Sequence, residues 1–359
     1  MNSKRQFEID IAKGLAIVFM VLVHTTEYFY CGKNPTFQAI AEFLGGPLAA
    51  PVFMVALGVG VNYTRDSSPK HFAKRGCHML IMSYVYNLLV YAAPYILKYF
   101  QTGDSGYLDT AVVEFLNVDI LQFAALTFIT FAIIKKFNLN TVQIIVYAAV
   151  VSVLGQFLTY SIILPDGWIR RILGLFWGSN EASFFPYCSW IVFPLVGYVF
   201  GKVLINCEDK KRLYRKIAAV AIPSEFLLMA IGIYFAIDFG QLTGDYHIAY
   251  YHMGIYANIC FLAFVFGWLS ICYLISLYIP KGILAYLTKI CNNITKIYVI
   301  QYILIIYSYV FIAAEEHNLD IVQSVLLFAL VFILSDKIAD LYNSGINRWK
   351  QNRIKAGKA

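Results

Sequence analysis

The feature that most constrains the fold of this chain is a succession of long apolar segments with short polar connectors. A helix needs about 20 consecutive apolar residues to cross the hydrocarbon core of a bilayer. Of the 359 residues, 60% are hydrophobic and only 14% are charged, whereas soluble domains carry about 25% charged residues. We therefore expect an all-α integral membrane protein with about ten transmembrane helices. The predicted spans lie near residues 10–30, 41–62, 77–99, 111–134, 141–163, 184–205, 217–239, 255–279, 295–313 and 319–341.

The distribution of basic residues predicts the orientation of these spans. If the N-terminus is cytoplasmic, all but four of the 28 Lys and Arg residues fall on the cytoplasmic side. Such a bias follows the positive-inside rule, so both termini are expected in the cytoplasm. The net charge of +7 lies in short loops, where it suits anionic lipid rather than nucleic acid. The four exceptions are Lys33, Lys98, Arg170 and Arg171.

The chain shows no internal repeat and no separate soluble domain. We expect a single polytopic domain over residues 1–345 and a short basic cytoplasmic tail over 346–359. The basic start leads into a full span without a small-residue cleavage site, which argues against a cleavable signal peptide. The seven cysteines show no C-x-x-C spacing, so no metal site is expected. The absence of Walker, G-x-S-x-G and H-E-x-x-H motifs argues against ATP-driven pumps and ordinary hydrolases.

The first span carries ionisable residues in an otherwise apolar run. Lys13 and His24 are eleven positions apart, so at about 100° per residue they share one helix face, roughly 16 Å apart. Ionisable groups inside a membrane are costly and by default indicate a functional site. His24 is a candidate general base because histidine titrates near physiological pH. The alternatives are an interfacial polar residue or a helix-to-helix hydrogen bond for His24, and for Lys13 a snorkelling side chain paired with Asp10.

Two carboxylates are candidate partners for this histidine. Glu27 follows His24 by three residues and lies on a neighbouring face, where it could orient the imidazole or act as a solvated loop charge. Asp119 lies in the outer half of the fourth span, one turn before Gln122, and a buried aspartate needs a partner. His24 lies at a similar depth. The alternative for Asp119 is a polar contact that only holds helices together.

Further polar residues are candidates for binding at the two membrane surfaces, although each also has a structural explanation. On the outer side, paired arginines and aromatic–histidine clusters are suited to an anionic or hydroxyl-rich substrate, or to an interfacial belt; they are Arg170, Arg171, Trp190 and His252. On the inner side, basic and amide residues are suited to phosphate contact, or to topology control and packing; they are Arg65, Lys74, Arg75 and Asn293.

The first span also carries a family resemblance. Lys13-x10-His24, preceded by Asp10 and followed by Gly14, resembles the [RK]-x10-H signature of membrane acyltransferases of the acyltransferase-3 type and of the related heparan-α-glucosaminide N-acetyltransferase-like group. Looser similarities follow along nearly the whole chain: Pro51-Val-Phe-Met-Val-Ala-Leu-Gly58, Asp119-Ile-Leu-Gln122, and Phe185-Pro-Tyr-Cys-Ser-Trp190 through Gly197-Tyr-Val-Phe-Gly201. Lys13 replaces the commoner arginine, which keeps the charge but loses the bidentate fork. The Arg-x-x-Arg pair of many acyltransferase-3 members is not evident.

The resemblance implies transfer of an acyl group, usually acetyl, from cytosolic acetyl-CoA to a hydroxyl or amine of a carbohydrate at the outer side. His24 would be the general base, or the carrier of an acyl-histidine intermediate, with Asp119 or Glu27 orienting it. Lys13 and the basic inner loops would contact the CoA. Asp10, Gln122 and the outer candidates would contact the acceptor. A bacterial inner membrane is the expected location, and the oligomeric state is open.

A transporter of a small polar solute is the main alternative from another functional class. Broken helices and intramembrane Lys, His and Asp are also transporter features. The hydropathy pattern shows no inverted repeat, and the ionisable groups concentrate on the first and fourth spans. A purely structural membrane protein is a third alternative, and it predicts that a His24→Ala substitution is silent.

Overall fold

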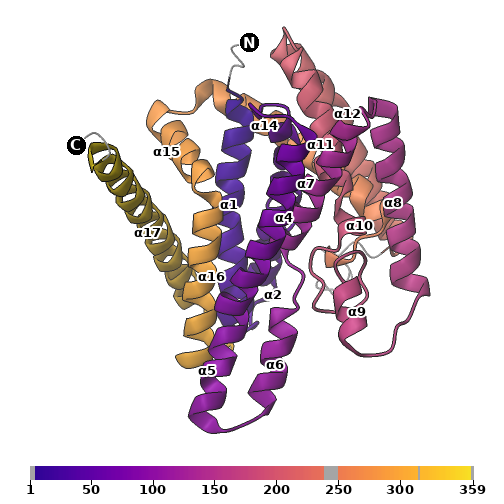
Figure 1. Ribbon diagram of the computed structural model, residues 1–359. Coiled ribbons are helices and arrows are strands. Elements are labelled where there is room, and N and C mark those ends of the chain that lie inside the picture. Colours follow the sequence, from indigo (N-terminus) through magenta and orange to yellow (C-terminus); the bar gives the residue numbers. More distant parts are fainter. Residues whose placement is uncertain (1–4, 238–249, 314–315, 357–359) are drawn as a thin grey trace.

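The computed structural model describes residues 5–237, 250–313 and 316–356, with side chains described up to residue 349. This part of the chain consists of helices joined by short loops, with two isolated β-bridges and no strand (Figure 1). The helices are α1 (Phe7–Phe29), α2 (Pro35–Gly45), α3 (Ala50–Val61), α4 (Pro69–Tyr86), a π-helix η1 (Asn87–Ala92), α5 (Ala93–Thr102), α6 (Gly106–Phe115), α7 (Ile120–Lys136), α8 (Thr141–Ser161), α9 (Trp168–Leu173), α10 (Tyr187–Trp190), α11 (Val192–Ile205), α12 (Lys210–Tyr234), α14 (Ile255–Tyr278), α15 (Lys281–Asn292), α16 (Ile294–Phe311) and α17 (Ile321–Ala356).

Eight helical segments of the described chain are long and apolar enough to cross a membrane. They confirm the all-α membrane fold and match eight of the predicted spans. The segments are Pro35–Val61, Pro69–Thr102, Thr141–Ser161, Tyr187–Ile205, Lys210–Tyr234, Ile255–Tyr278, Ile294–Phe311 and Ile321–Trp349.

The predicted spans 10–30 and 111–134 are not among these eight. The second of them is divided into α6 and α7, because the chain leaves the helix between Phe115 and Ile120; α7 alone has 17 residues, fewer than the roughly 20 of a typical span. The first corresponds to α1. It is the central helix of the bundle and packs against α2, α3, α14, α15, α16 and α17.

Glycines bring α3 and α11 into backbone contact. A Cβ atom on Gly58 would lie 1.9 Å from the carbonyl oxygen of Pro194, and one on Gly197 would lie 2.1 Å from that of Val55. Small residues allow this close approach between membrane helices. Gly60 lies on the other side of α3, with nothing within 4 Å of its Cβ position.

Short backbone pairings hold the helix ends around α1. Val118 N donates to the carbonyl of Ala182 at 2.9 Å, and Phe184 N donates back to the carbonyl of Val118 at 2.9 Å. This pairing brings the α6–α7 break beside the segment that precedes α10. At the end of α1, Cys31 N donates to the carbonyl of Leu319 at 3.0 Å. Residues distant in the sequence are thereby gathered at the end of α1 that is remote from the N-terminus.

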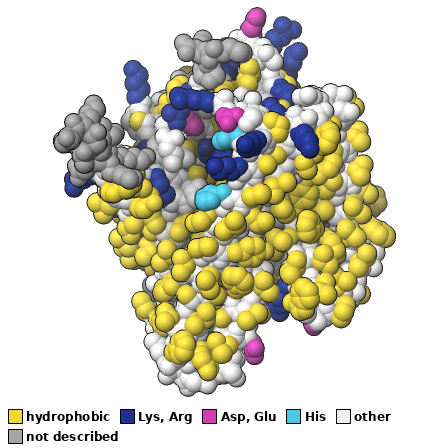
Figure 2. Space-filling model, in the orientation of Figure 1, with side chains coloured by type: hydrophobic (Ala, Val, Ile, Leu, Met, Phe, Trp, Pro, Cys, Tyr) yellow, Lys and Arg dark blue, Asp and Glu magenta, His cyan; other side chains and the backbone are white. Residues whose placement is uncertain are grey.

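The molecular surface separates charged and apolar regions. Figure 2 shows Lys and Arg side chains gathered toward the end of the molecule that carries the N-terminus, above a surface that is largely hydrophobic. At the same end, buried Glu8 of α1 accepts hydrogen bonds from Lys210 at 2.8 Å and from the hydroxyl of Tyr214 at 3.1 Å. This ion pair ties the start of α12 to the start of α1.

Candidate active site

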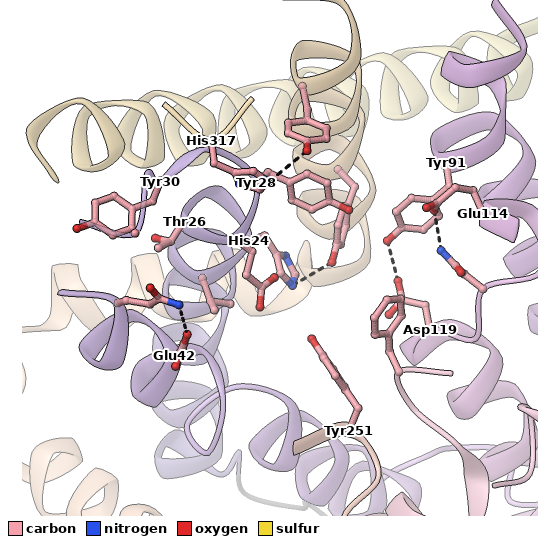
Figure 3. A pocket seen from close by; sticks show the side chains of 18 of the residues that line it. His24, Thr26, Tyr28, Tyr30, Glu42, Tyr91, Glu114, Asp119, Tyr251 and His317 are labelled. Atoms are coloured by element: carbon pink, nitrogen blue, oxygen red, sulfur yellow. Dashed lines mark hydrogen bonds between the residues drawn. The ribbon is translucent and has the colours of Figure 1, made fainter. Parts of the chain in front are cut away.

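A cavity of about 440 Å³ lies beside the last two turns of α1 (Figure 3). Its walls combine α1, η1, the α6–α7 break, α16 and the segments near residues 184 and 251. The lining includes three sequence-predicted residues, His24, Glu27 and Asp119, together with Tyr28, Gln38, Glu42, Tyr91, Glu114, Asn117, Phe184, Phe185, Tyr251, Tyr302 and His317. The structure thus brings the three candidate catalytic residues to one space.

His24 is held by α16 through both ring nitrogens. Its Nδ1 lies 2.9 Å from Nε2 of Gln301, and its Nε2 lies 3.0 Å from the hydroxyl of Tyr302. The two rings are 4.5 Å apart between centroids. Oε1 of Gln301 is buried without a hydrogen-bond partner among the described residues. Because half a turn of the amide exchanges its donor and acceptor, Gln301 can support either tautomer of His24.

Asp119 is fixed by tyrosines rather than by His24. Its carboxylate accepts hydrogen bonds from the hydroxyls of Tyr91, at 2.9 Å, and of Tyr298. The predicted His24–Asp119 pair is therefore not formed as a direct contact. Instead the Tyr302 ring, which contacts His24, lies 5.4 Å from the ring of Tyr91 and 5.1 Å from that of Tyr298.

Local irregularities of the helices position Tyr91 and Asp119, which form the hydrogen bond described above. Tyr91 belongs to the π-helix η1, and such bulges re-aim side chains, often at functional sites. Asp119 is the N-cap of α7, where it accepts a hydrogen bond from Ile120 N at 2.6 Å. Gln122 completes the capping box: its Oε1 accepts from Asp119 N at 3.1 Å. Gln122, predicted to contact substrate, is thus used by the backbone and is not among the cavity-lining residues.

Glu27 lines the cavity without a hydrogen-bond or ion-pair partner among the residues that the structure describes. The predicted contact in which Glu27 orients the imidazole is not formed, since Gln301 and Tyr302 occupy both nitrogens of His24. The carboxylate is therefore free to meet a ligand in the cavity.

A second, smaller pocket of about 40 Å³ adjoins the same residues. It shares Val23, His24, Glu27, Asp119, Phe185 and Tyr251 with the main cavity. Its remaining walls come from α1 one turn closer to the N-terminus, from the end of α2 and the start of α3, and from the starts of α7 and α16, and most are apolar: Met20, Gly45, Ala49, Ala50, Phe53, Ile120, Tyr250 and Tyr298. His24 thus stands at the junction between a wide polar cavity and a narrow apolar pocket.

A polar groove of about 500 Å³ continues from the other side of the main cavity. The two spaces share the lining residues Glu114, Asn117 and Phe184, and Arg170 and Arg171 line the groove. Arg170 is engaged by Asp166 and donates to the carbonyl of Ser179 at 2.6 Å. The side chain of Arg171 has no hydrogen-bond or ion-pair partner within the described chain, so its guanidinium is available to a ligand.

Two outer candidates lie behind the cavity wall rather than on it. Trp190 is fully buried; its Nε1 donates to the carbonyl of Tyr251 at 2.8 Å, and its ring packs on Phe185. His252 is also buried, with its Nε2 at 2.8 Å from the carbonyl oxygen of Ser183. Trp190 thereby supports Tyr251 and Phe185, which do line the site. His247, the other histidine of the external aromatic–histidine cluster that contains His252, lies outside the described residues.

The inner candidates lie apart from the cavity, at or near the N-terminal end of α1. Asp10 pairs with Arg5 instead of Lys13. Lys13 has no hydrogen-bond or ion-pair partner among the described residues. Asn293 accepts from Asn343 Nδ2 at 2.8 Å and is buried against α17. The loop and α4 candidates Arg65, Lys74 and Arg75 are exposed, and the guanidinium of Arg75 lies 4.1 Å above the ring of Phe128.

A model of a protein family described as an acyltransferase domain matches residues 6–339. The chain belongs to the acyltransferase-3 family. With its eight apolar spans, this makes it an integral membrane acyltransferase and favours the acyl-transfer hypothesis over the transporter alternative. Neither a search of curated proteins nor a search of solved structures returned a match.

Sequence reasoning missed the tyrosines that organise the acyltransferase cavity. Tyr91 and Tyr302 stand in apolar runs with many other aromatic residues, and nothing local distinguishes them. Gln301 and Tyr298 follow Asn293 by eight and five residues, but the sequence does not link them to His24 or Asp119. The available signal was the Tyr298–Gln301–Tyr302 spacing, since residues three and four apart share a helix face.

Proposed function

We propose that this acyltransferase moves an acetyl group from cytosolic acetyl-CoA to a carbohydrate hydroxyl on the other side of a bacterial inner membrane, with His24 as general base. The position of His24 between a polar cavity and an apolar pocket is the observation that carries the proposal. Acyl transfer needs this arrangement, because the base must reach a hydroxyl that arrives from one side and an acyl carbon that arrives from the other.

The chemical step follows from this placement. The acceptor hydroxyl gives its proton to a neutral ring nitrogen of His24 while its oxygen bonds to the carbonyl carbon of the thioester. The carbon–sulfur bond then breaks, and the thiolate leaves as CoA thiol with the proton returned from the imidazolium. Nε2, which faces the Tyr302 hydroxyl at 3.0 Å, is the nitrogen best placed to react when Nδ1 carries the proton and donates a hydrogen bond to the amide oxygen of Gln301.

The acyl donor is a polyanionic substrate and suits the basic end of the molecule. Arg65 in the α3–α4 loop and Lys74 and Arg75 in the first turns of α4 are exposed and near one another in the sequence. Guanidinium and ammonium groups bind phosphate through charge-assisted hydrogen bonds. Lys13, on the same helix as His24 and without a partner in the described chain, is a further candidate contact for the donor.

The carbohydrate acceptor suits the opposite end. The main cavity and the adjoining groove offer carboxylates, amides and aromatic rings, a mixture that matches a hydroxyl-rich ligand. Arg171 supplies an unengaged guanidinium in the groove, whereas Arg170 is already bound by Asp166. We expect Arg171 to contact a part of the acceptor that is not acylated.

The test is release of CoA thiol from acetyl-CoA by purified protein in nanodiscs, with a panel of sugar acceptors. The wild type is compared with His24→Ala and with His78→Ala, a matched control at an exposed position on α4. We expect acceptor-stimulated release that is lost in His24→Ala and kept in His78→Ala. Release that persists in folded His24→Ala would remove His24 as the base. If the wild type neither binds acetyl-CoA nor releases CoA thiol from it, the proposed use of acetyl-CoA is wrong.

A further inference from the structure

We infer that the small pocket beside His24 holds the acyl group during transfer and restricts it to about two or three carbons. The inference rests on the proposed acyl transfer and adds a donor specificity to it. It starts from the difference in size between the two spaces that meet at His24: about 440 Å³ for the main cavity and about 40 Å³ for the pocket.

The volume of the pocket matches a very short acyl group. A cavity needs about 10–15 Å³ to hold one water molecule, which has one non-hydrogen atom. The 40 Å³ of this pocket therefore accommodates about three non-hydrogen atoms. An acetyl group has three: the carbonyl carbon, its oxygen and the methyl carbon. A hexanoyl chain adds four methylenes, and these cannot enter unless a wall moves.

Apart from His24, Glu27 and Asp119, the walls are largely apolar, and they are closely packed. Met20 and Ala49 are 6% and 2% exposed, and the Phe53 side chain completes the inner side. Two other lining residues bring α2 close against α1: a Cβ atom on Gly45 would lie 2.2 Å from the Cβ of Val23. Close-packed interiors respond to a change of even one methylene. The pocket therefore has little capacity to expand around a longer chain.

Met20 is placed to limit the chain length. It lies four residues before His24 on α1, which is one turn and about 6 Å along the helix axis. With the thioester carbon at the imidazole, the acyl tail points toward Met20 and Phe53. One extra methylene in a hydrophobic pocket changes a rate by about 10- to 200-fold. We expect the wild-type rate to fall by at least about 10-fold for each step from acetyl to propionyl to butyryl.

The test compares acetyl-, propionyl-, butyryl- and hexanoyl-CoA with one sugar acceptor in wild type, Met20→Ala and Phe53→Ala. Either substitution is expected to raise the butyryl-to-acetyl rate ratio by about 10-fold or more. Met54→Ala is the matched control: Met54 is 1% exposed, so its truncation also removes a buried side chain, but it does not line the pocket. It should keep the wild-type ratio.

A second readout needs no turnover. S-alkyl-CoA thioethers carry the chain but cannot transfer it, and a ligand that binds the folded protein raises its Tm. We expect S-ethyl-CoA to raise the wild-type Tm more than S-hexyl-CoA at the same concentration, and Met20→Ala to reduce this difference. Phe53→Ala serves the same purpose if Met20→Ala does not fold.

The outcomes separate this inference from the proposed function. Equal wild-type rates with acetyl- and hexanoyl-CoA would overturn the chain-length limit and leave acyl transfer intact. Ratios that change as much in Met54→Ala as in Met20→Ala would also overturn it. Absence of transfer and of thioether binding for every chain length would refute the use of acyl-CoA itself, and the inference would fall with it.

Discussion

Replacing Gln301 with leucine is expected to lower acyl transfer by about 10- to 100-fold in a protein that remains folded. Gln301 is fully buried, and its Nε2 lies 2.9 Å from Nδ1 of His24. Leaving a buried polar group without its partner costs about 1–3 kcal/mol, and 1.4 kcal/mol is a factor of ten. The hydrogen bond from Gln301 favours one orientation and one tautomer of the His24 imidazole. Without it, a larger fraction of the protein has the ring in an orientation or tautomer that cannot accept the proton.

Gln301→Glu distinguishes the tautomers. A carboxylate only accepts, so it requires the proton on Nδ1 of His24 and leaves Nε2, beside the Tyr302 hydroxyl, unprotonated and able to receive the proton of the acceptor. If Nε2 is the reacting atom, the glutamate variant keeps more activity than the leucine variant. If Nδ1 reacts, both variants lose activity.

The assay is the initial rate of CoA release at saturating acetyl-CoA and acceptor in nanodiscs, so that kcat is measured apart from binding. Gln101→Leu, on the exposed face of α5, is the matched control and should behave as the wild type. A Gln301→Leu protein with wild-type Tm and wild-type kcat would refute the idea that α16 orients His24.

Two further substitutions test the packing and the outer groove. Gly58→Ala should lower the free energy of unfolding by about 1–3 kcal/mol, because its Cβ would lie 1.9 Å from the carbonyl oxygen of Pro194. Gly60→Ala, with nothing within 4 Å, should not destabilise the protein; equal Tm values for the two variants would contradict this packing. Arg171→Ala should raise the KM for the acceptor by about 10- to 100-fold, because it removes the binding free energy of a hydrogen bond to a charged group. The KM for acetyl-CoA should not change. An equal rise in Arg212→Ala, exposed on α12, would exclude a specific role for Arg171.

The spans were predictable because the bilayer imposes a length and a composition on them. The span predicted at 141–163 is the helix Thr141–Ser161, and that at 255–279 is Ile255–Tyr278. The break at residues 116–119 was missed because hydropathy averages over a window and passes over a helix end. Asp119 and Gln122 have the spacing of a capping box, a local signal that predicts a helix start.

The site was predictable in part for a different reason. A histidine or carboxylate inside an apolar run is conspicuous, so His24, Glu27 and Asp119 could be identified, and the fold brings all three to one cavity. Their partners were not predictable, because Gln301 is 277 positions from His24 and no local pattern links them. Trp190 illustrates the reverse error: an aromatic residue at the start of a span is expected at the interface, but neighbouring rings bury it.

Helix α16 contacts both His24 and Asp119 through residues that span little more than one helical turn. Tyr298 bonds Asp119, while Gln301 and Tyr302 hold the two nitrogens of His24. The spacing between the imidazole and the carboxylate is therefore set by the rise of a single helix, not by the loops that connect α1 to α7. A change in the tilt of α16, even one caused by a substitution on its outer surface, displaces both groups together. Neither group can be adjusted through this helix without disturbing the other.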